Sequence, residues 1–328
     1  MTFNYKNVYL NDTSTVCGPV ENNGPLKKYF DKAYDDMYFG EESFEKAEVK
    51  LVKESINILL RKCGLNREDI NLVVGGDLLN QITASTYGTY GVGDSYIGVY
   101  SACSTSVLGM IVASNFIEGN FINNAIVEVS SHNSAAEKQY RNPVEYGAPK
   151  QDSSTFTSTG GAACFLSNEE SSIRVDCATL GKIINYEQSD VNDMGRVMAP
   201  AAYETLVSHF EETGRTPEYY DLILTGDLGI YGREILKDYM KEAGYRLDNY
   251  NDCGVMLYDL DNQSEVHAGG SGPVCSALVN FGYIFNQLKK KKLKKVLLVA
   301  TGALFSPTTI HQGDDIYSIA HAISLEVI

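Results

Sequence analysis

The sequence has 328 residues, of which 44% are hydrophobic, and a formal net charge of −15. This length suits two domains of ordinary size, and the hydrophobic fraction excludes a disordered chain. The negative charge disfavours nucleic acid as a partner and disfavours non-specific binding to anionic lipid.

The first residues contain no basic segment followed by an apolar one, so the sequence predicts no signal peptide. No run approaches the roughly 20 apolar residues of a membrane span, so any membrane association is expected to be peripheral. Seven cysteines, several with apolar neighbours, favour reduced thiols in a cytosolic protein. Five histidines and the absence of a Cys-x-x-Cys pair predict no metal site, and nothing indicates a cofactor.

An internal repeat organises the chain. Residues 60–78 and 210–228 share one pattern at a constant offset of 150 residues: the end of a helix, a glycine stop, a capped turn and a buried strand that ends in Gly-Asp. A second match, at an offset of 170, aligns residues 101–103 with 271–273 and residues 126–129 with 296–299. Because both halves alternate strands and helices, we expect an α/β architecture with mainly parallel sheets.

The segment 101–106 (SACSTS) carries the chemistry of the first half. It follows a strand-like run at 95–100 and opens an apolar run at 107–116. Cys103 is therefore expected at the N-terminus of a buried helix, where the helix dipole and free N–H groups favour a thiolate or an anionic ligand. The segment predicts either a cysteine nucleophile or a small anion-binding pocket.

Several motifs resemble the thiolase and ketoacyl synthase superfamily. Residues 102–106 resemble its nucleophile elbow, 160–163 its glycine-rich strand and 267–272 the glycine loop of its second half. Within that superfamily, segments 76–81, 130–133, 145–147, 193–195, 198–202 and 222–228 resemble the stage V sporulation protein AD family. The resemblance implies a duplicated thiolase-like α/β fold with αβαβα layers. Its first half would be residues 1–170, which carry Cys103, and its second half residues 171–328, which carry the glycine loop.

The same resemblance implies a function in spore formation. Members bind dipicolinic acid (pyridine-2,6-dicarboxylate) for uptake into the developing spore. In this chain the ligand is expected as the free acid or as its calcium chelate. It further implies a cytoplasmic protein peripherally associated with the inner spore membrane, with membrane proteins of the same sporulation operon as partners. A homodimer is a further option, and residues 141–146 are candidates for a partner contact.

Two positions argue against catalysis. Condensing enzymes of the superfamily have a histidine after the strand equivalent to 222–226 and a histidine or asparagine in the glycine loop, where this chain has Asp227 and Ser271. A serine hydroxyl is not a base near neutral pH, and a negative charge on Asp227 would raise the pKa of the Cys103 thiol. We therefore expect a retained pocket in a protein that is not an enzyme.

The predicted ligand pocket comprises Cys103, Asp227, Ile230 and Ser271, with His132 at its mouth. The helix N-terminus and the glycine loop would supply donors, and Ile230 would cover the ring of the ligand. Two alternatives stay open: an acyl-transferring condensing enzyme with Cys103 as nucleophile and His132 as base, and a scaffold protein with a vestigial pocket. Ser104 and Asp77 are interpreted as local caps.

Overall fold

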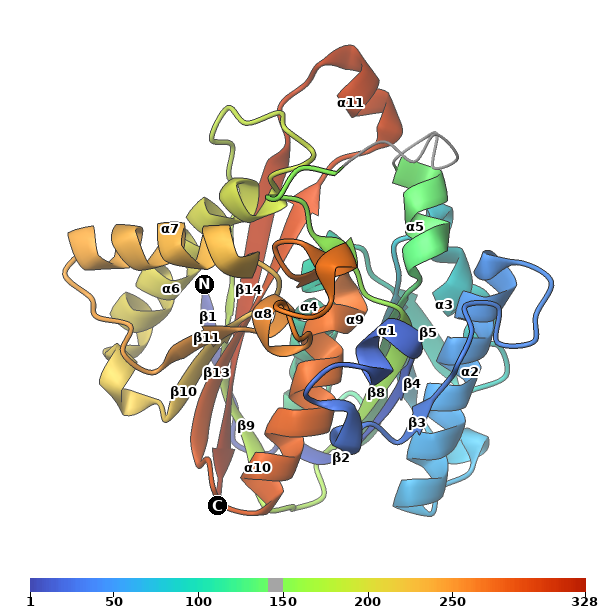
Figure 1. Ribbon diagram of the computed structural model, residues 1–328. Coiled ribbons are helices and arrows are strands. Elements are labelled where there is room, and N and C mark those ends of the chain that lie inside the picture. Colours follow the sequence, from blue (N-terminus) through green and yellow to red (C-terminus); the bar gives the residue numbers. More distant parts are fainter. Residues whose placement is uncertain (141–149) are drawn as a thin grey trace.

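A computed structural model describes residues 1–140 and 150–328 and shows a mixed α/β protein (Figure 1). Its strands are β1 (Thr2–Asn4), β2 (Tyr9–Cys17), β3 (Lys32–Ala33), β4 (Leu72–Gly76), β5 (Ser95–Gly98), β6 (Asn124–Ser131), β7 (Phe156–Thr157), β8 (Gly160–Ser167), β9 (Ile173–Leu180), β10 (Leu222–Thr225), β11 (Tyr250–Asp252), β12 (Gly270–Ser271), β13 (Lys295–Leu304) and β14 (Tyr317–Val327). Its helices are α1 (Pro19–Asn22), α2 (Phe44–Cys63), α3 (Thr83–Gly88), α4 (Thr105–Glu118), α5 (Asn133–Tyr140), α6 (Met194–Thr213), α7 (Gly229–Glu242), α8 (Cys253–Met256), α9 (Pro273–Ala277), α10 (Phe285–Lys289) and α11 (Pro307–Gln312). A π-helix, Leu278–Ile284, joins α9 to α10.

The main sheet divides into two corresponding halves. Its strand order is β11-β10-β13-β14-β9-β2-β8-β6-β4-β5, with β1 added to β9 and β3 to β2. Strands β9 and β2 are joined by a single residue pair, Tyr9 with Arg174, which leaves five strands of this order on either side. The expectation of mainly parallel sheets is wrong, because β8 pairs antiparallel with β6 and β2, and β14 pairs antiparallel with β13 and β9.

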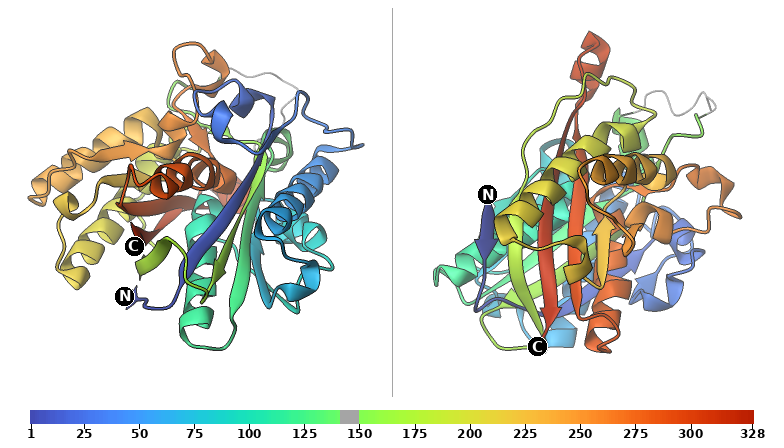
Figure 2. Two further views of the ribbon diagram at one scale, coloured as in Figure 1. Left: turned by 90° about the horizontal axis from the view of Figure 1, so that it is seen from below. Right: turned by 90° about the vertical axis from the view of Figure 1, so that its left-hand side faces the viewer.

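Helices lie outside and between the two halves of the sheet. Helix α2 packs on β2, β6 and β8, whereas α6 packs on β13 and β14 at the opposite side of the molecule (Figures 1 and 2). Helix α4 contacts β4 and β6 of one half-sheet and β13 and β14 of the other. The resulting order of layers is helix, sheet, helix, sheet, helix.

The repeat in the sequence has a counterpart in the helices. Helix α2 spans residues 44–63 and α6 spans 194–213, so both ends are displaced by 150 residues. Each helix ends at a glycine with left-handed backbone, Gly64 with φ 68° and Gly214 with φ 67°, a conformation that glycine adopts without a Cβ clash. The two helices carry corresponding outer layers of the fold.

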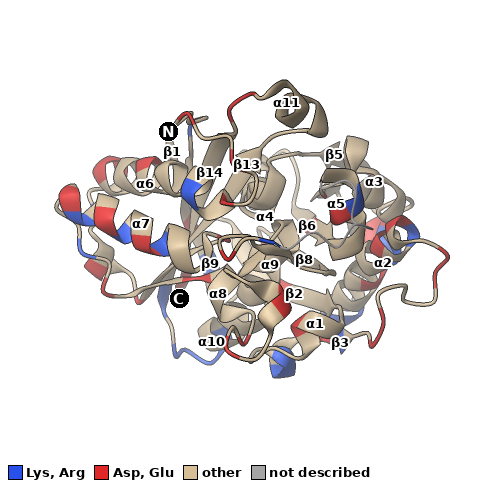
Figure 3. Cartoon of the chain, turned by 45° about the horizontal axis from the view of Figure 1, so that its top comes forward, with Lys and Arg blue, Asp and Glu red and all other residues tan. Residues whose placement is uncertain are grey.

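Charge follows the same layering. Asp, Glu, Lys and Arg residues occur along the outer helices α2 and α7 and in many loops, whereas the inner helix α9 contains none of them (Figure 3). A helix between two sheets is surrounded by apolar side chains, and an unpaired charge there would be costly. No helix within the described residues is long and apolar enough to cross a membrane.

Candidate functional site

Cys103 lies in a strained turn between β5 and α4. It belongs to a 3₁₀ turn, Ala102–Ser104, that runs directly into α4, so the predicted position before a buried helix is confirmed. Ala102 has φ 47°, a left-handed conformation that is uncommon for a residue with a Cβ atom. Such strain is found where the surrounding structure holds a functional side chain in place.

The glycine loop of the second half reaches the cysteine directly. Strand β12 forms a two-stranded parallel ladder with β7, in which Gly270 pairs with Phe156 and Ser271 with Thr157. Gly272 then adopts φ 93° and its backbone N–H donates to Cys103 Sγ at 3.2 Å. The ladder therefore attaches the loop to the first half and aims one N–H group at the sulfur.

Asp227 follows β10 and is buried beside the thiol. Its Oδ1 accepts a hydrogen bond from Thr301 Oγ1 at 2.7 Å, whereas Oδ2 has no hydrogen-bond partner within the described residues. Burial raises the pKa of Asp227 to about 7. The loop itself is held by Asp252, whose carboxylate accepts from the N–H groups of Leu228 at 2.9 Å and Gly229 at 3.0 Å.

The thiol of Cys103 is in its protonated form. Burial raises its pKa well above the ordinary value, and the adjacent Asp227 carboxyl raises it further; the Gly272 N–H opposes this only in part. Because the thiolate is the nucleophilic form of cysteine, this environment makes Cys103 a poor nucleophile. A cationic neighbour would lower the thiol pKa, and here the neighbour is an acid.

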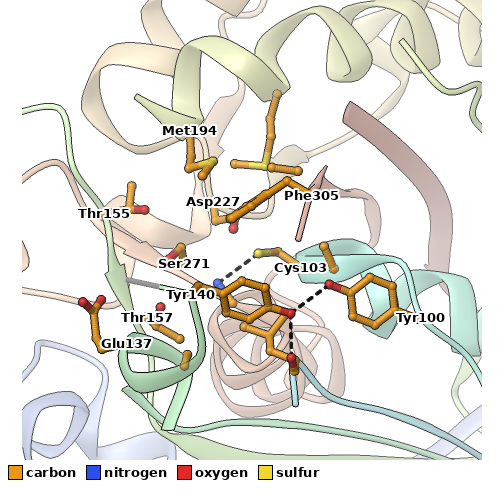
Figure 4. A pocket seen from close by; sticks show the side chains of 16 residues that line it. Tyr100, Cys103, Glu137, Tyr140, Thr155, Thr157, Met194, Asp227, Ser271 and Phe305 are labelled. Atoms are coloured by element: carbon orange, nitrogen blue, oxygen red, sulfur yellow. Dashed lines mark hydrogen bonds between the residues drawn. The ribbon is translucent and has the colours of Figure 1, made fainter. Parts of the chain in front are cut away.

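These groups line a cavity of about 60 Å³, roughly the space of four water molecules by the usual measure (Figure 4). Apolar side chains form most of its wall, among them Met194 and Met198 from α6 and Phe305 after β13. Tyr100 and Tyr140 close one side. The polar part consists of Cys103, Asp227, Ser271, Glu137, Thr155 and Thr157.

The structure brings together Cys103, Asp227 and Ser271 but not the other two predicted site residues. Ile230 lies in the first turn of α7, where its N–H donates to the Ala268 carbonyl at 2.8 Å, and it does not line the cavity. His132 is buried on the far side of β6: its Nε2 is 2.7 Å from the Met37 carbonyl and its ring packs against Phe44. Placing His132 at the mouth of this cavity is therefore wrong.

Asp77 makes local contacts to backbone N–H groups, whereas Ser104 stands before α4 without a capping hydrogen bond, so its interpretation as a cap is wrong. Asp77 accepts from the N–H groups of Leu79 and Ser85, both at 2.7 Å. Ser104 Oγ donates to the Ser101 carbonyl at 2.6 Å and does not line the cavity. Residues 141–146, the candidates for a partner contact, lie outside the described residues.

Sequence reasoning missed a histidine next to the cysteine turn. His321 on β14 is buried, and its Nδ1 accepts from the Gly181 N–H at 3.2 Å. Its proton is therefore on Nε2, which donates to Ser101 Oγ at 3.2 Å. Burial lowers the pKa of His321 to about 4, so it stays neutral and fixes the turn that carries Cys103. No motif places it there, because it belongs to the last strand of the chain.

Comparison with known structures shows the fold. A variant of OleA from Xanthomonas campestris matches with a TM-score of 0.65 at 13% identity, covering 99% of this chain and 98% of that one. The tetronic acid condensing enzyme AbyA1 matches with a TM-score of 0.59 at 15% identity, covering 97% of this chain and 99% of the enzyme. These likenesses confirm the thiolase-like fold class expected from the sequence.

Comparison of sequences shows the family. The sequence model of Stage V sporulation protein AD (SpoVAD) matches residues 1–326. Stage V sporulation protein AD of Bacillus subtilis (strain 168) is 43% identical over 320 residues, which cover 97% of this chain and 94% of that protein. The chain therefore belongs to the stage V sporulation protein AD family, with the thiolase-like fold of the condensing enzymes.

Proposed function

We propose that the chain binds dipicolinic acid in the Cys103 cavity, without catalysing a reaction, and so serves its uptake into the developing spore. One observation carries the non-catalytic part. The described residues that line the cavity include no histidine, lysine or arginine, and the residue beside the thiol is Asp227. A condensing reaction starts from a thiolate, and the acid beside the Cys103 thiol disfavours that form.

The charge of the cavity restricts the form of the ligand. Two carboxyl groups, Asp227 and Glu137, line it, and Lys150 pairs with Glu137 Oε1 at 3.2 Å. A free dicarboxylate dianion would therefore meet like charge at Asp227. A neutral calcium chelate avoids this repulsion, and so does protonated Asp227, which donates to a ligand carboxylate through its otherwise unpartnered Oδ2.

The remaining walls suit a flat ring that carries polar groups. Hydroxyl groups of Ser271 and Thr157 stand on one side of the cavity and the thioether of Met194 on another (Figure 4), and Met198 also lines it. Thioethers pack favourably against aromatic rings. Since the pKa of Asp227 is about 7, we expect binding of free dipicolinate to strengthen as the pH falls from 8 to 6.

Calorimetric titration with dipicolinic acid, with and without calcium, tests the proposal. Saturable heat is expected, and Ser271→Ala is expected to weaken binding about five-fold by removing one hydroxyl donor. Ser153→Ala, outside the cavity, is the matched control and should bind as the unchanged chain does. Absence of heat both with and without calcium would refute dipicolinic acid binding.

The alternative is an acyl-transferring enzyme, which the likeness to condensing enzymes keeps in view. Incubation with several acyl thioesters followed by intact-mass analysis should then show an adduct on Cys103. We expect none, because the thiol is protonated. If neither ligand nor adduct is found, a scaffold with a vestigial pocket is the remaining explanation.

The proposed setting follows from family membership. We propose a cytoplasmic protein at the inner spore membrane that works with membrane proteins of the same sporulation operon. Co-purification of those proteins with the tagged chain from sporulating cells, against a tagged unrelated protein, tests this setting. A homodimer stays a prediction, which sedimentation of the purified chain would settle.

A further inference from the structure

The Cys103 cavity has a neighbour with which it shares a wall. A groove of about 640 Å³ lies beside it, bordered by the α3 region, the end of β5 and the residues before α11. Among its lining residues are Asn80, Gln81 and Thr308. Three residues line both spaces: Tyr100, Tyr140 and Phe305.

These three aromatic residues lie between the groove and the cavity. Within the described part of the chain, sixteen residues line the cavity. All of them are buried except Tyr100, Tyr140, Phe305 and Cys103 itself. Tyr100, for example, is 45% exposed. A small molecule that reaches the thiol from the groove therefore passes between these rings.

Hydrogen bonds hold the rings together. The hydroxyl groups of Tyr100 and Tyr140 are 3.2 Å apart, and Tyr140 Oη also donates to the Leu78 carbonyl at 2.7 Å. Figure 4 shows the two hydroxyl groups directed toward each other. The ring of Phe305 meets that of Tyr140 edge to face, with centroids 5.4 Å apart. The closed arrangement thus depends on two hydrogen bonds and one ring contact, each of about 1 kcal/mol.

We propose that Tyr100, Tyr140 and Phe305 form a gate that sets the size of molecule admitted from the groove to the Cys103 cavity. The three rings stand between the groove and the cavity, so a molecule wider than the gap between them enters from the groove only when the rings separate. The inference concerns the cavity proposed above as the ligand site, but it does not depend on which ligand binds there.

Two maleimides of different size, N-ethylmaleimide and N-(1-pyrenyl)maleimide, test the gate. Both react by the same addition of the thiol to the maleimide double bond, so the ratio of their rates at Cys103 cancels the effect of the thiol pKa. Peptide mass spectrometry reads the rate at each cysteine separately. Cys63 is half-buried and outside the cavity, and therefore serves as an internal reference in every sample.

Tyr140→Phe is expected to raise the ratio of bulky to small reagent at Cys103 about thirty-fold, which corresponds to about 2 kcal/mol from two lost hydrogen bonds. Tyr140→Ala should raise it further, and Tyr100→Phe, which loses one of these hydrogen bonds, should raise it about five-fold. Tyr90→Phe, at a tyrosine that is 87% exposed and outside both spaces, is the matched control and should leave the ratio unchanged.

An unchanged ratio at Cys103 in a folded Tyr140→Ala variant would overturn the gate. If that variant does not fold, unchanged ratios in both Tyr→Phe variants overturn it instead. A rise at Cys63 as large as that at Cys103 would show general loosening and also refute the proposal. Failure of dipicolinic acid to bind would not change any of these rates, so the two proposals fail separately.

Discussion

Asp227→Asn is expected to stabilise the protein at neutral and alkaline pH and to change its stability little at acidic pH. Asp227 is fully buried, and the pKa of its carboxyl is about 7 in the folded chain against an ordinary value of 3.8. Between these two values the folded chain keeps a proton that the unfolded chain has released. The free energy of unfolding therefore falls as the pH rises from about 4 to about 7.

The size of this loss follows from the two pKa values. Their difference of about 3 corresponds to about 4 kcal/mol, since each pKa unit is worth 1.36 kcal/mol. Asparagine cannot ionise and so does not incur this loss. Its amide oxygen still accepts the hydrogen bond that Thr301 Oγ1 now donates to Asp227 Oδ1 at 2.7 Å. The variant should therefore resemble the protonated form of the native site.

Urea denaturation of both proteins at several values between pH 4.5 and 8.5 measures this difference. We expect the free energies of unfolding to agree near pH 4.5 and to differ by several kcal/mol in favour of Asp227→Asn at pH 8. Asp248→Asn, at an exposed carboxyl on the surface, is the control and should give no pH-dependent difference. A difference that stays constant across the whole range would show that Asp227 is ionised in the folded chain, and would refute the reasoning.

Two further substitutions test the framework of the site. Burial raises the pKa of Glu128 to about 8, so the unchanged chain loses stability as the pH rises above about 5. Glu128→Gln avoids this loss, and its free energy of unfolding should exceed that of the unchanged chain by more at pH 8.5 than at pH 5, as measured by urea titration. Gly272→Ala should lower the melting temperature and weaken ligand binding at least ten-fold. Its φ of 93° disfavours any side chain, and a Cβ would lie 2.8 Å from Ser131 Oγ. Normal melting and binding of Gly272→Ala would contradict the proposed role of the loop.

The repeat made the fold predictable, because each copy ends its helix at a glycine and its strand at Gly-Asp. Two such copies place Asp227 and Ser271 of the second half opposite Cys103 of the first, and the structure shows these three residues together. The direction of the strands was less predictable. Strands β13 and β14 pair antiparallel although the connection between them, residues 305–316, contains helix α11, and no local residue pattern indicates this direction.

Side-chain direction at the end of a strand explains why the prediction of His132 at the mouth of the cavity is wrong. Ser131 points toward the cavity side of β6, where its hydroxyl donates to the Ser158 carbonyl at 2.7 Å. The next residue points to the opposite face, and His132 packs there against Phe39 and Phe44. The sequence indicates which edge of the sheet a strand end reaches. Which face it presents depends on the register, which was not known.

The gate tyrosines were missed for a different reason. Neither Tyr100 nor Tyr140 belongs to a motif, and Tyr100 enters the sequence analysis only as the last residue of the strand-like run 95–100. Their hydroxyl groups meet across 40 positions of sequence, and Phe305 approaches from the second half. A contact of this kind depends on the relative placement of three elements, so single-sequence motifs carry no signal for it.

Asp227→His should remove the electrostatic effect that helps to keep the Cys103 thiol protonated. Two causes raise the pKa of the thiol, burial first and the Asp227 carboxyl second. Asp227→Asn removes the second cause, and Asp227→His also adds an imidazole that is neutral at pH 8 and accepts the thiol proton as a base. The rate of Cys103 alkylation by iodoacetamide at pH 8, referred to Cys63 in the same sample, should therefore increase from the unchanged chain to Asp227→Asn to Asp227→His. Since burial is the larger cause and persists in both variants, neither should reach the rate of a free thiol in solution. Equal rates in all three proteins would mean that burial alone holds the proton on Cys103, and that the acid at position 227 serves the ligand and not the thiol.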